Sequence, residues 1–499
     1  MNALLVLHAD DNVAVAVRAI ATNERVTVDG TTLTLLSDVP AGHKVARIAI
    51  ASGAPVMKYG FPIGRATVNI AAGDWVHEHN LRTALSGADS TLPRLAASHA
   101  GSATTPSDMP TFMGFRRASG RVGIRNEIWI INTVGCVNHA AEKIAAQARQ
   151  RFDGMVDGVY AFSHPYGCSQ LGDDLSHTRQ ILAGLMRHSN AGGVLVLGLG
   201  CENNQLDALL NAADGIDRSR VRYFNTQDVA DEIEEGVEAV AELVALLLSD
   251  RRTECPASDL ILGMKCGGSD GLSGVSANPL VGRIADRLTA LGGGVLLTEV
   301  PEMFGAEHVL ASRAATPEVR DQVLTMVRDF KAYFTAHGQP VSENPSPGNK
   351  AGGLTTLEEK SLGAIQKGGS ATVRAVRRYG ALAPSHGLTL LEAPGNDGVS
   401  STAMVASGAT MLLFTTGRGT PLGFPVPTVK ISSNSAIAER KPHWIDFNAG
   451  ALLDGSATMK ELTDRLFARV LEIASGTMRA NNEVNGNREI AIWKDGVTL

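Results

Sequence analysis

The stretch SHPYGCSQLGDD (residues 163–174) places a histidine, a thiol, a hydroxyl and two carboxylates directly after the apolar run Val156 to Phe162. A short, continuous apolar run of this kind is typical of a buried strand in a parallel sheet. In open α/β sheets, ligands bind outside the carboxyl ends of the strands. The stretch therefore predicts an α/β fold with parallel strands and a reaction site at the end of this strand.

The same arrangement recurs three times further along the chain. Strand-like apolar runs at 192–199, 260–264 and 295–300 each lead into a loop rich in glycine and polar side chains. The groups at these strand ends are Cys201 and Glu202, then Lys265 and Cys266, then Glu299 and Glu302. Reactive polar groups are unsuited to packing a core, so the pattern indicates an enzyme.

Length and composition restrict the class of protein. A chain of 499 residues is too long for one core and predicts two or three domains. The net charge of −6 gives no basic surface for nucleic acid. No apolar run reaches the roughly 18 residues of a membrane span, and the N-terminus lacks a signal-peptide pattern. Five cysteines are too few for a disulfide framework, so a reducing, cytoplasmic location is expected.

The N-terminal part differs in character from the rest. Residues 1–85 contain short β-type runs separated by turn sequences, and only Asn12 to Thr22 has a helical pattern. This predicts a small β-rich domain. Residues 86–110 are rich in Ser, Ala, Thr, Gly and Pro without periodicity, which predicts a linker.

From residue 111 onward, strand patterns alternate with helical ones, as in a mostly parallel sheet. A polar break at 250–258 predicts a division into two α/β lobes, 111–255 and 256–499, that form a two-lobed catalytic body. The segment SENPSPGNKAGG (342–353) is predicted to be a long functional loop.

Two sets of side chains suit metal binding. His77 and His79 lie two residues apart, so in a strand both imidazoles point to one face and could reach one metal or substrate. The alternative is an exposed, solvated strand end. Thiolates suit iron or an iron–sulfur cluster, and cysteines follow four strand-like runs; the alternative is inert, buried thiols. These cysteines are Cys136, Cys168, Cys201 and Cys266.

Other strand-end groups suit acid–base chemistry and substrate binding. Lys265, Asp270 and Glu299 follow strands of the second lobe, where perturbed pKa values favour proton transfer, although surface ion pairing is the default. Asn396 and Asp397 precede a helix whose N-terminus could hold an anion, and Arg418 suits a carboxylate. Nucleotide-binding glycine motifs are absent from the sequence, which argues against a nucleotide-dependent reaction.

Eight segments spread over almost the whole chain resemble the altronate/galactarate dehydratase family of sugar-acid lyases, which also includes sulfolactate sulfo-lyase. They are NEIWIINTVGCVN (126–138), FSHPYGCSQLGDD (162–174), GLGCENNQ (198–205), KCGGSDGLSG (265–274), LTEVPEMFGAE (297–307), ENPSPGNKAGG (343–353), APGND (393–397) and TTGRG (415–419). The first 85 residues resemble the small β-clip, antifreeze-like (SAF) domain of this family. Length and the intact ending KDGVTL (494–499) favour the altronate branch.

The resemblance implies dehydration of a sugar acid, altronate before galactarate, to 2-dehydro-3-deoxy-D-gluconate in hexuronate catabolism. It also implies a divalent metal, usually iron(II) or manganese. Homodimers are common among such enzymes. Two alternatives remain: elimination of sulfite from a sulfonated hydroxy acid, and a non-catalytic sugar-acid binding protein.

A mechanism can be assigned to these residues as a hypothesis. The reaction removes a proton α to a carboxylate and expels the neighbouring hydroxyl, and a metal can stabilise the enediolate as a Lewis acid. The expected metal ligands are His77 and His79, joined by Cys168 or Glu202. The expected base is Lys265 or Glu299, and the expected proton donor is His164, Asp173 or Asp174. The expected substrate-binding residues are Ser269, Asp270, Asn396, Asp397 and Arg418.

Overall fold

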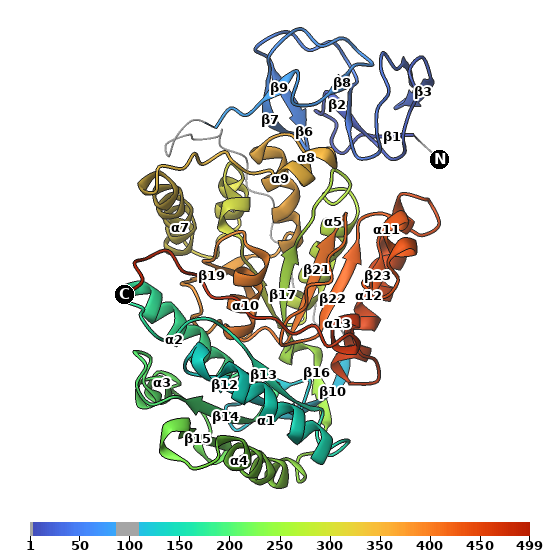
Figure 1. Ribbon diagram of the computed structural model, residues 1–499. Helices are drawn as coiled ribbons and strands as arrows, with labels where there is room; N and C mark the ends of the chain where they lie inside the picture. The colour runs from blue at the N-terminus through green and yellow to red at the C-terminus, as the bar shows by residue number, and fades with distance from the viewer. Residues whose placement is uncertain (1–2, 86–108) are drawn as a thin grey trace.

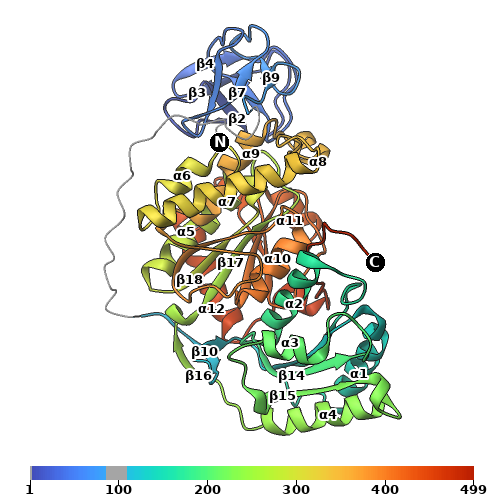
Figure 2. The same cartoon turned by 90° about the vertical axis from the view of Figure 1, so that its left-hand side faces the viewer.

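The computed structural model describes residues 3–85 and 109–499, and it places three structural parts in a row (Figure 1). The N-terminal β-domain lies at one end. A seven-stranded parallel sheet occupies the middle, and a four-stranded parallel sheet lies at the other end (Figure 2). The predicted alternation of strands and helices with parallel sheets is thus confirmed. The predicted linker falls almost entirely outside the described residues.

The N-terminal domain consists of short antiparallel strands in three small sheets. Their bounds are β1 Leu4–Leu5, β2 Val13–Ala16, β5 Lys44–Ala46 and β8 Trp75–Val76 in one sheet, β3 Arg25–Val28 and β4 Thr31–Thr34 in another, and β6 Pro55–Lys58, β7 Phe61–Ala66 and β9 Leu81–Arg82 in the third. The prediction of a helix over Asn12 to Thr22 is wrong. Alternating Val and Ala at 13–16 instead pair with β1 and β5 and are fully buried.

The four-stranded sheet has the order β13-β12-β14-β15, and every pair of strands is parallel. The strands are β12 Glu127–Asn132, β13 Gly158–Phe162, β14 Ala191–Gly198 and β15 Val221–Asn225. Helices α1 Asn138–Arg151 and α4 Glu232–Leu247 pack on one face, and α2 Gly172–Met186 and α3 Leu206–Ala212 pack on the other. A small antiparallel sheet, β10 Thr111–Arg116, β11 Val122–Gly123 and β16 Thr253–Pro256, connects this part to the next.

The seven-stranded sheet has the order β19-β20-β18-β17-β21-β22-β23 and is also parallel. The strands are β17 Ile261–Cys266, β18 Gly294–Leu297, β19 Val373–Arg377, β20 Gly387–Leu391, β21 Met411–Thr416, β22 Thr428–Ser432 and β23 Phe447–Asn448. The helices of this part are α5 Ala277–Ala290, α6 Glu307–Ala311, α7 Pro317–Ala336, α8 Pro347–Ala351, α9 Leu357–Ala364, α10 Asp397–Ala406, α11 Ser435–Arg440, α12 Met459–Ala474 and α13 Asn481–Val484.

Two predictions for this part need correction. The strand expected at 295–300 ends at Leu297, and Glu299 has left-handed backbone with φ 70°. The segment 342–353 is not loop throughout, because α8 begins at Pro347, and proline suits the first turn of a helix. Both differences lie next to the candidate site described below.

The two parallel sheets share one apolar core. Helices α2 and α10 pack against each other, and Gly184 of α2 meets the backbone of Ala406 of α10 closely enough that a side chain there would collide. The last residues of the chain run along these helices, where Ala491 contacts Gly398 and Gly496 contacts Asp174. No helix in the described part of the chain combines the length and apolar character needed to cross a membrane.

Candidate active site

The carboxyl ends of two central strands bring buried charged groups together. Lys265 and Cys266 are the last residues of β17, and Glu299 follows the neighbouring strand β18. Asp397 is the first residue of α10, and Lys367 lies in the 3₁₀ turn Ile365–Gly368. Parallel strands end at the same edge of a sheet, so residues far apart in sequence meet there.

Glu299 is the centre of this cluster. One carboxylate oxygen accepts a hydrogen bond from Lys265 Nζ, and the other accepts one from Lys367 Nζ at 2.7 Å. Lys265 Nζ also donates to Asp397 Oδ1 at 2.8 Å. A left-handed backbone is uncommon for a glutamate and costs free energy, so the fold holds Glu299 in an unfavourable conformation.

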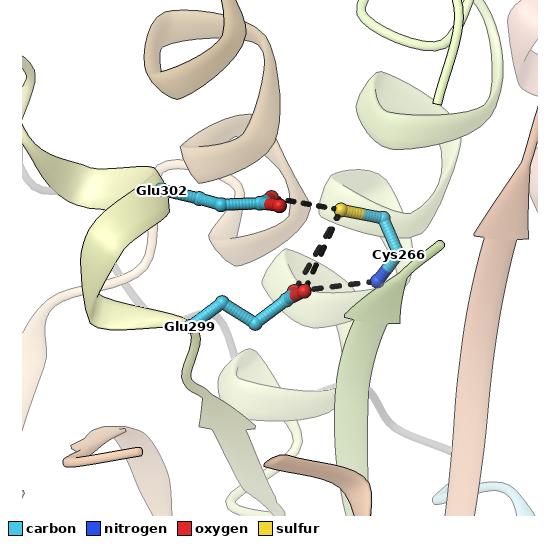
Figure 3. A group of neighbouring side chains, drawn as sticks. All are labelled: Cys266, Glu299 and Glu302. Atoms are coloured by element: carbon cyan, nitrogen blue, oxygen red, sulfur yellow. Dashed lines mark hydrogen bonds between the residues drawn. The ribbon is translucent and has the colours of Figure 1, made fainter. Parts of the chain in front are cut away.

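Cys266 and Glu302 extend the cluster (Figure 3). Cys266 Sγ lies 3.1 Å from Glu302 Oε2. Lys367 Nζ lies 2.8 Å from the same sulfur. Lys360 Nζ pairs with Glu302 Oε1 at 2.9 Å. Asp397 is the most open member, with 35% of its side chain exposed, whereas Lys265 and Glu299 are fully buried.

The buried charges set each other's protonation. Burial would lower the pKa of Lys265, but Asp397 and Glu299 raise it above its usual range. Burial would raise the pKa of Glu302, but Lys360, Lys367 and Lys265 lower it to about 2. Burial, with Glu299 and Glu302 adding to it, raises the pKa of Cys266 to about 12. At neutral pH the cluster therefore holds protonated lysines, an ionised Glu302 and a neutral Cys266 thiol.

Cys266, Glu299 and Glu302 are the group in the described ranges whose ligand atoms could surround one metal ion, since those atoms all lie within 4.8 Å of one another. However, three ammonium groups already neutralise the two carboxylates, and the thiol is protonated. A dication here would face strong repulsion from the lysines. The arrangement as folded does not fit a divalent metal.

The predicted substrate-binding residues lie beside this cluster. A Cβ on Gly267 would lie 2.5 Å from Asp397 Oδ2, and the backbone oxygen of Gly268 accepts hydrogen bonds from Gly417 and Arg418 at 3.1 Å each. The structure therefore gathers the loops that carry Ser269, Asp397 and Arg418. Arg418 is exposed, and it donates to the Gly348 carbonyl at 3.1 Å.

Asp270 and Asn396 have structural contacts instead of free polar atoms. Asp270 is buried and accepts hydrogen bonds from Ser273, Ser433 and Asn434, and burial raises its pKa despite them. Asn396 caps α10 by accepting from the backbone N–H of Val399 at 3.1 Å. Both side chains thus stabilise the loops of the site, and their contact with substrate stays a prediction.

The N-terminal domain docks on the same side of the seven-stranded sheet. Lys44 and Lys58 both pair with the buried Glu359 of α9, at 2.9 and 2.8 Å. Glu78, between the two predicted metal-binding histidines, pairs with Lys350 of α8 at 2.7 Å. The turn that carries His77 and His79 therefore lies against the segment 343–353 that also contacts Ser269 and Arg418.

His77 is half-buried beside Trp75 and His43, with ring centroids 5.3 and 4.9 Å away. Burial lowers its pKa to about 4, and nearby Lys44 and His43 add to this. The imidazole is therefore neutral at neutral pH, the form that binds metals.

The other predicted residues lie in a different place. Cys168 precedes α2 and Glu202 follows β14 of the four-stranded sheet, whereas β8, which precedes His77, belongs to the N-terminal domain (Figure 1). Among the described residues, the group whose ligand atoms lie within 4.8 Å of one another is Cys266, Glu299 and Glu302, which contains none of these four residues. The structure therefore does not bring His77 and His79 together with Cys168 and Glu202 within one chain. Burial alone would raise the pKa of Glu202, but hydrogen bonds from Thr133 and from backbone N–H groups at 199 and 200 lower it.

The three predicted proton donors also lie at this second location. His164 is buried, and its ring nitrogens contact the Asn132 carbonyl at 2.9 Å and the Tyr166 N–H at 3.2 Å. Asp174 is buried and accepts from the backbone of Asp495 and Gly496, at 2.9 and 3.0 Å. Asp173 is exposed in the first turn of α2. These contacts favour loop positioning for His164 and Asp174, and their catalytic roles stay predictions.

Two members of the cluster were missed by sequence reasoning. Lys360 and Lys367 lie in a segment, LEEKSLGAIQKGG (357–369), that carries no motif. Both are buried, together with Glu358 and Glu359. The one available signal was a short helix with charged residues on every face. If such a helix is buried, its charges must be paired with one another or with groups from other elements.

Comparison with known proteins agrees with this architecture over the whole chain. Family models for the altronate/galactarate dehydratase SAF domain, for the second domain of D-galactarate dehydratase/altronate hydrolase, and for the C-terminal part of D-galactarate/altronate dehydratase match residues 2–84, 114–247 and 257–498.

Individual relatives match over similar lengths. Altronate dehydratase of Bacillus subtilis is 48% identical and covers 100% of both chains. Altronate dehydratase of Escherichia coli is 50% identical with 99% of each chain covered. Galactarate dehydratase (L-threo-forming) of Escherichia coli is 34% identical over 98% of this chain and 96% of its own. This chain therefore belongs to the altronate/galactarate dehydratase family.

Proposed function

We propose that this chain is a hydro-lyase that dehydrates D-altronate to 2-dehydro-3-deoxy-D-gluconate. Similarity over the full length to two altronate dehydratases supports the substrate, since identity to the galactarate enzyme is clearly lower. The buried lysine–carboxylate cluster at the ends of β17 and β18 supports the reaction, and we place the chemistry at its open edge.

The reaction needs a concentrated positive charge. Loss of a proton α to a carboxylate creates a dianionic enediolate, and fixed cations stabilise it best where water is excluded. Lys265 and Lys367 provide two buried ammonium groups that cannot move away, because Glu299 binds both. The raised pKa of Lys265 keeps it protonated and supports a role as fixed cation rather than the role of base.

Asp397 is our candidate for the base. It is the carboxylate of the cluster with an exposed face, so a bound hydroxy acid can reach it. Its hydrogen bond to Lys265 at 2.8 Å places the base beside the stabilising cation. Arg418, on the neighbouring loop, supports binding of the sugar-acid carboxylate by a bidentate contact.

The iron(II) or manganese implied by the family stays a prediction. We assign no step to it at the Lys265 cluster, because the donor set there is already neutralised by lysines. A homodimer and a cytoplasmic location are also proposals. The five free cysteines support a reducing compartment.

A substrate panel tests the proposal. Full-length chain, purified without oxygen, is incubated with D-altronate, D-galactarate or sulfolactate, with and without added iron(II) or manganese. Formation of 2-keto-3-deoxy acid from altronate, at least about tenfold above galactarate in kcat/KM, is the expected result. Product from galactarate or sulfolactate, with none from altronate, would overturn the assignment of altronate as the substrate. Saturable altronate binding without product under any metal would overturn the reaction.

A further inference from the structure

Three cysteines end neighbouring strands of the four-stranded sheet. Cys136 follows β12, Cys168 follows β13 and Cys201 follows β14, and β12 lies between the other two strands. All three thiols are exposed and free, whereas Cys255 and Cys266 are buried. None of the three belongs to the Lys265 cluster, which is built on the other parallel sheet.

The three loops are joined by backbone contacts close to each cysteine. The N–H of Gly135 donates to the Tyr166 carbonyl at 2.8 Å, and the N–H of Asn204 donates to the Gly167 carbonyl at 2.9 Å. Asn204 Nδ2 also donates to the Thr133 carbonyl at 3.1 Å. Every bonded residue lies within three positions of a cysteine, so the three cysteines lie on directly adjoining loops.

Glycine makes this close approach possible. Gly167 has φ 102° and lies against the backbone of Thr133 and Val134, where any side chain would collide. A Cβ on Gly135 would come within 2.7 Å of the His164 carbonyl oxygen. The three loops therefore pack closely against one another, while the three cysteines stay exposed.

Buried polar groups hold the loops in this arrangement. Glu202 accepts hydrogen bonds from Thr133 and from the N–H groups of residues 199 and 200. His164 is tied to the β12 end through the Asn132 carbonyl. Two sulfur atoms also have nearby donors: Ser169 Oγ lies 3.9 Å from Cys168 Sγ, and Gln227 Nε2 lies 3.7 Å from Cys201 Sγ.

The arrangement of the three cysteines on adjoining loops favours a polynuclear group over a single ion. In the described part of the chain, the ligand set close enough for one ion is the Cys266 group, which contains none of these three thiols. A cluster of several iron and sulfide ions is larger than one ion and takes thiolates that lie further apart. Hydrogen bonds to its sulfur atoms, of the kind that Ser169 and Gln227 can donate, tune such a cluster.

We propose that Cys136, Cys168 and Cys201 bind an iron–sulfur cluster through three thiolates, each thiol losing its proton on binding. Three thiolates leave one iron of a four-iron cluster without a cysteine ligand, open to a hydroxyl or carboxylate oxygen. None of the three ligands belongs to the Lys265 cluster, and occupation of the site does not depend on which sugar acid the chain dehydrates.

The test uses the full-length chain reconstituted under anaerobic conditions with iron and sulfide. The expected content is about four iron and four acid-labile sulfide ions per chain, with broad visible absorption and an electron paramagnetic resonance signal after reduction. Cys136→Ser, Cys168→Ser and Cys201→Ser are each expected to bind at least about tenfold less sulfide than the wild-type chain. Cys255→Ser and Cys266→Ser serve as controls that keep it.

Circular dichroism of every variant checks that the fold is intact, and an alanine at each of the three positions replaces any serine variant that misfolds. Absence of bound sulfide in the wild-type chain would overturn the inference. So would sulfide retained in the triple variant, or lost equally in Cys266→Ser. Altronate turnover, measured on the same samples, separates the two proposals: a cluster without turnover on any sugar acid overturns the proposed function alone.

Discussion

The two parallel sheets of this chain end in opposite kinds of chemistry. At the end of the seven-stranded sheet, lysines and carboxylates are buried and paired, and Glu299 binds two ammonium groups. At the end of the four-stranded sheet, carboxylates such as Glu202 are used to hold loops, and three thiols face the solvent. One rule of architecture, loops at the carboxyl ends of strands, produces both.

The difference shows what burial does to reactive groups. Cys266 is buried beside two carboxylates, and its pKa rises to about 12, so it stays a neutral thiol. Cys136, Cys168 and Cys201 are exposed and can lose their protons to a metal. Burial with counter-charges creates fixed cations for an anionic intermediate, whereas exposure keeps ligands available.

The largest effect is expected from removing a buried cation. Lys265→Met should lower altronate turnover by about 1,000-fold or more, because the enediolate loses a fixed positive charge. Lys331→Met is the matched control, since Lys331 is also buried and paired with one glutamate, Glu307 at 2.9 Å. Steady-state kinetics with altronate give the turnover of both variants. An equal loss of turnover in the two would contradict the role of Lys265 as the fixed cation.

Asp397→Asn tests the open edge of the same cluster. We expect turnover to fall about 100- to 1,000-fold with little change in KM, since a general base contributes to the chemical step. Asp207→Asn, at an exposed aspartate in the first turn of α3, is the control. If Asp397→Asn retains more than a tenth of the wild-type kcat, Asp397 is not the general base.

Glu299→Gln measures how much the buried pairing contributes to stability. Two ammonium groups would remain buried with less counter-charge, which we expect to lower the free energy of unfolding by about 3–5 kcal/mol. Cys168→Ser, at the exposed strand end, should change it by less than about 0.5 kcal/mol. Urea denaturation of the two variants gives the contrast, and similar values for both would contradict it.

Thiol reactivity compares the two strand ends directly. In native, metal-free chain at pH 8, three thiols should react with iodoacetamide at least about 100-fold faster than Cys255 and Cys266, because only exposed thiols form accessible thiolate. Mass spectrometry of digested protein identifies the labelled positions. Rapid labelling of Cys266 in folded chain would show that the cluster is open.

The smallest effect is expected from His77→Gln in the N-terminal domain, on the pH dependence of Tm. The folded pKa of His77, about 4, lies below the ordinary value of 6.5, so the unfolded chain takes up a proton first as pH falls. Its contribution to stability is complete above pH 6.5 and is lost between pH 6.5 and about 4. Hence His77→Gln should reduce the fall in Tm between pH 7 and pH 5 by about 1–2 °C. Exposed His139→Gln should leave that fall unchanged.

Sequence reasoning located the strands well but not the partners of their end groups. Buried parallel strands read as uninterrupted apolar runs, so β14 and β17 fall within a residue or two of the predicted ranges. The alternating Val and Ala residues at 13–16 also fit a helical pattern. They form a strand because they pair with β1 and β5, which the local sequence does not show.

The residues of the candidate site also fall into those that the sequence predicted and those that only the structure shows. Lys265, Glu299 and Asp397 were singled out from their positions after strands, and the structure brings them into contact. Lys360 and Lys367 could not be found, because a lysine in a helix without a motif reads as solvated surface. The joint ligand set of His77, His79, Cys168 and Glu202 was not brought together, since spacing along the chain says nothing about which domains face each other.

The sequence by itself determined the family, the parallel α/β architecture and the strand ends that carry reactive groups, because apolar runs, glycines and long motifs are local signals. Only the tertiary structure decided which of those groups are buried against lysines and which stay exposed as thiols. Burial and charge pairing arise from strand order and domain packing, and no short stretch of sequence contains them.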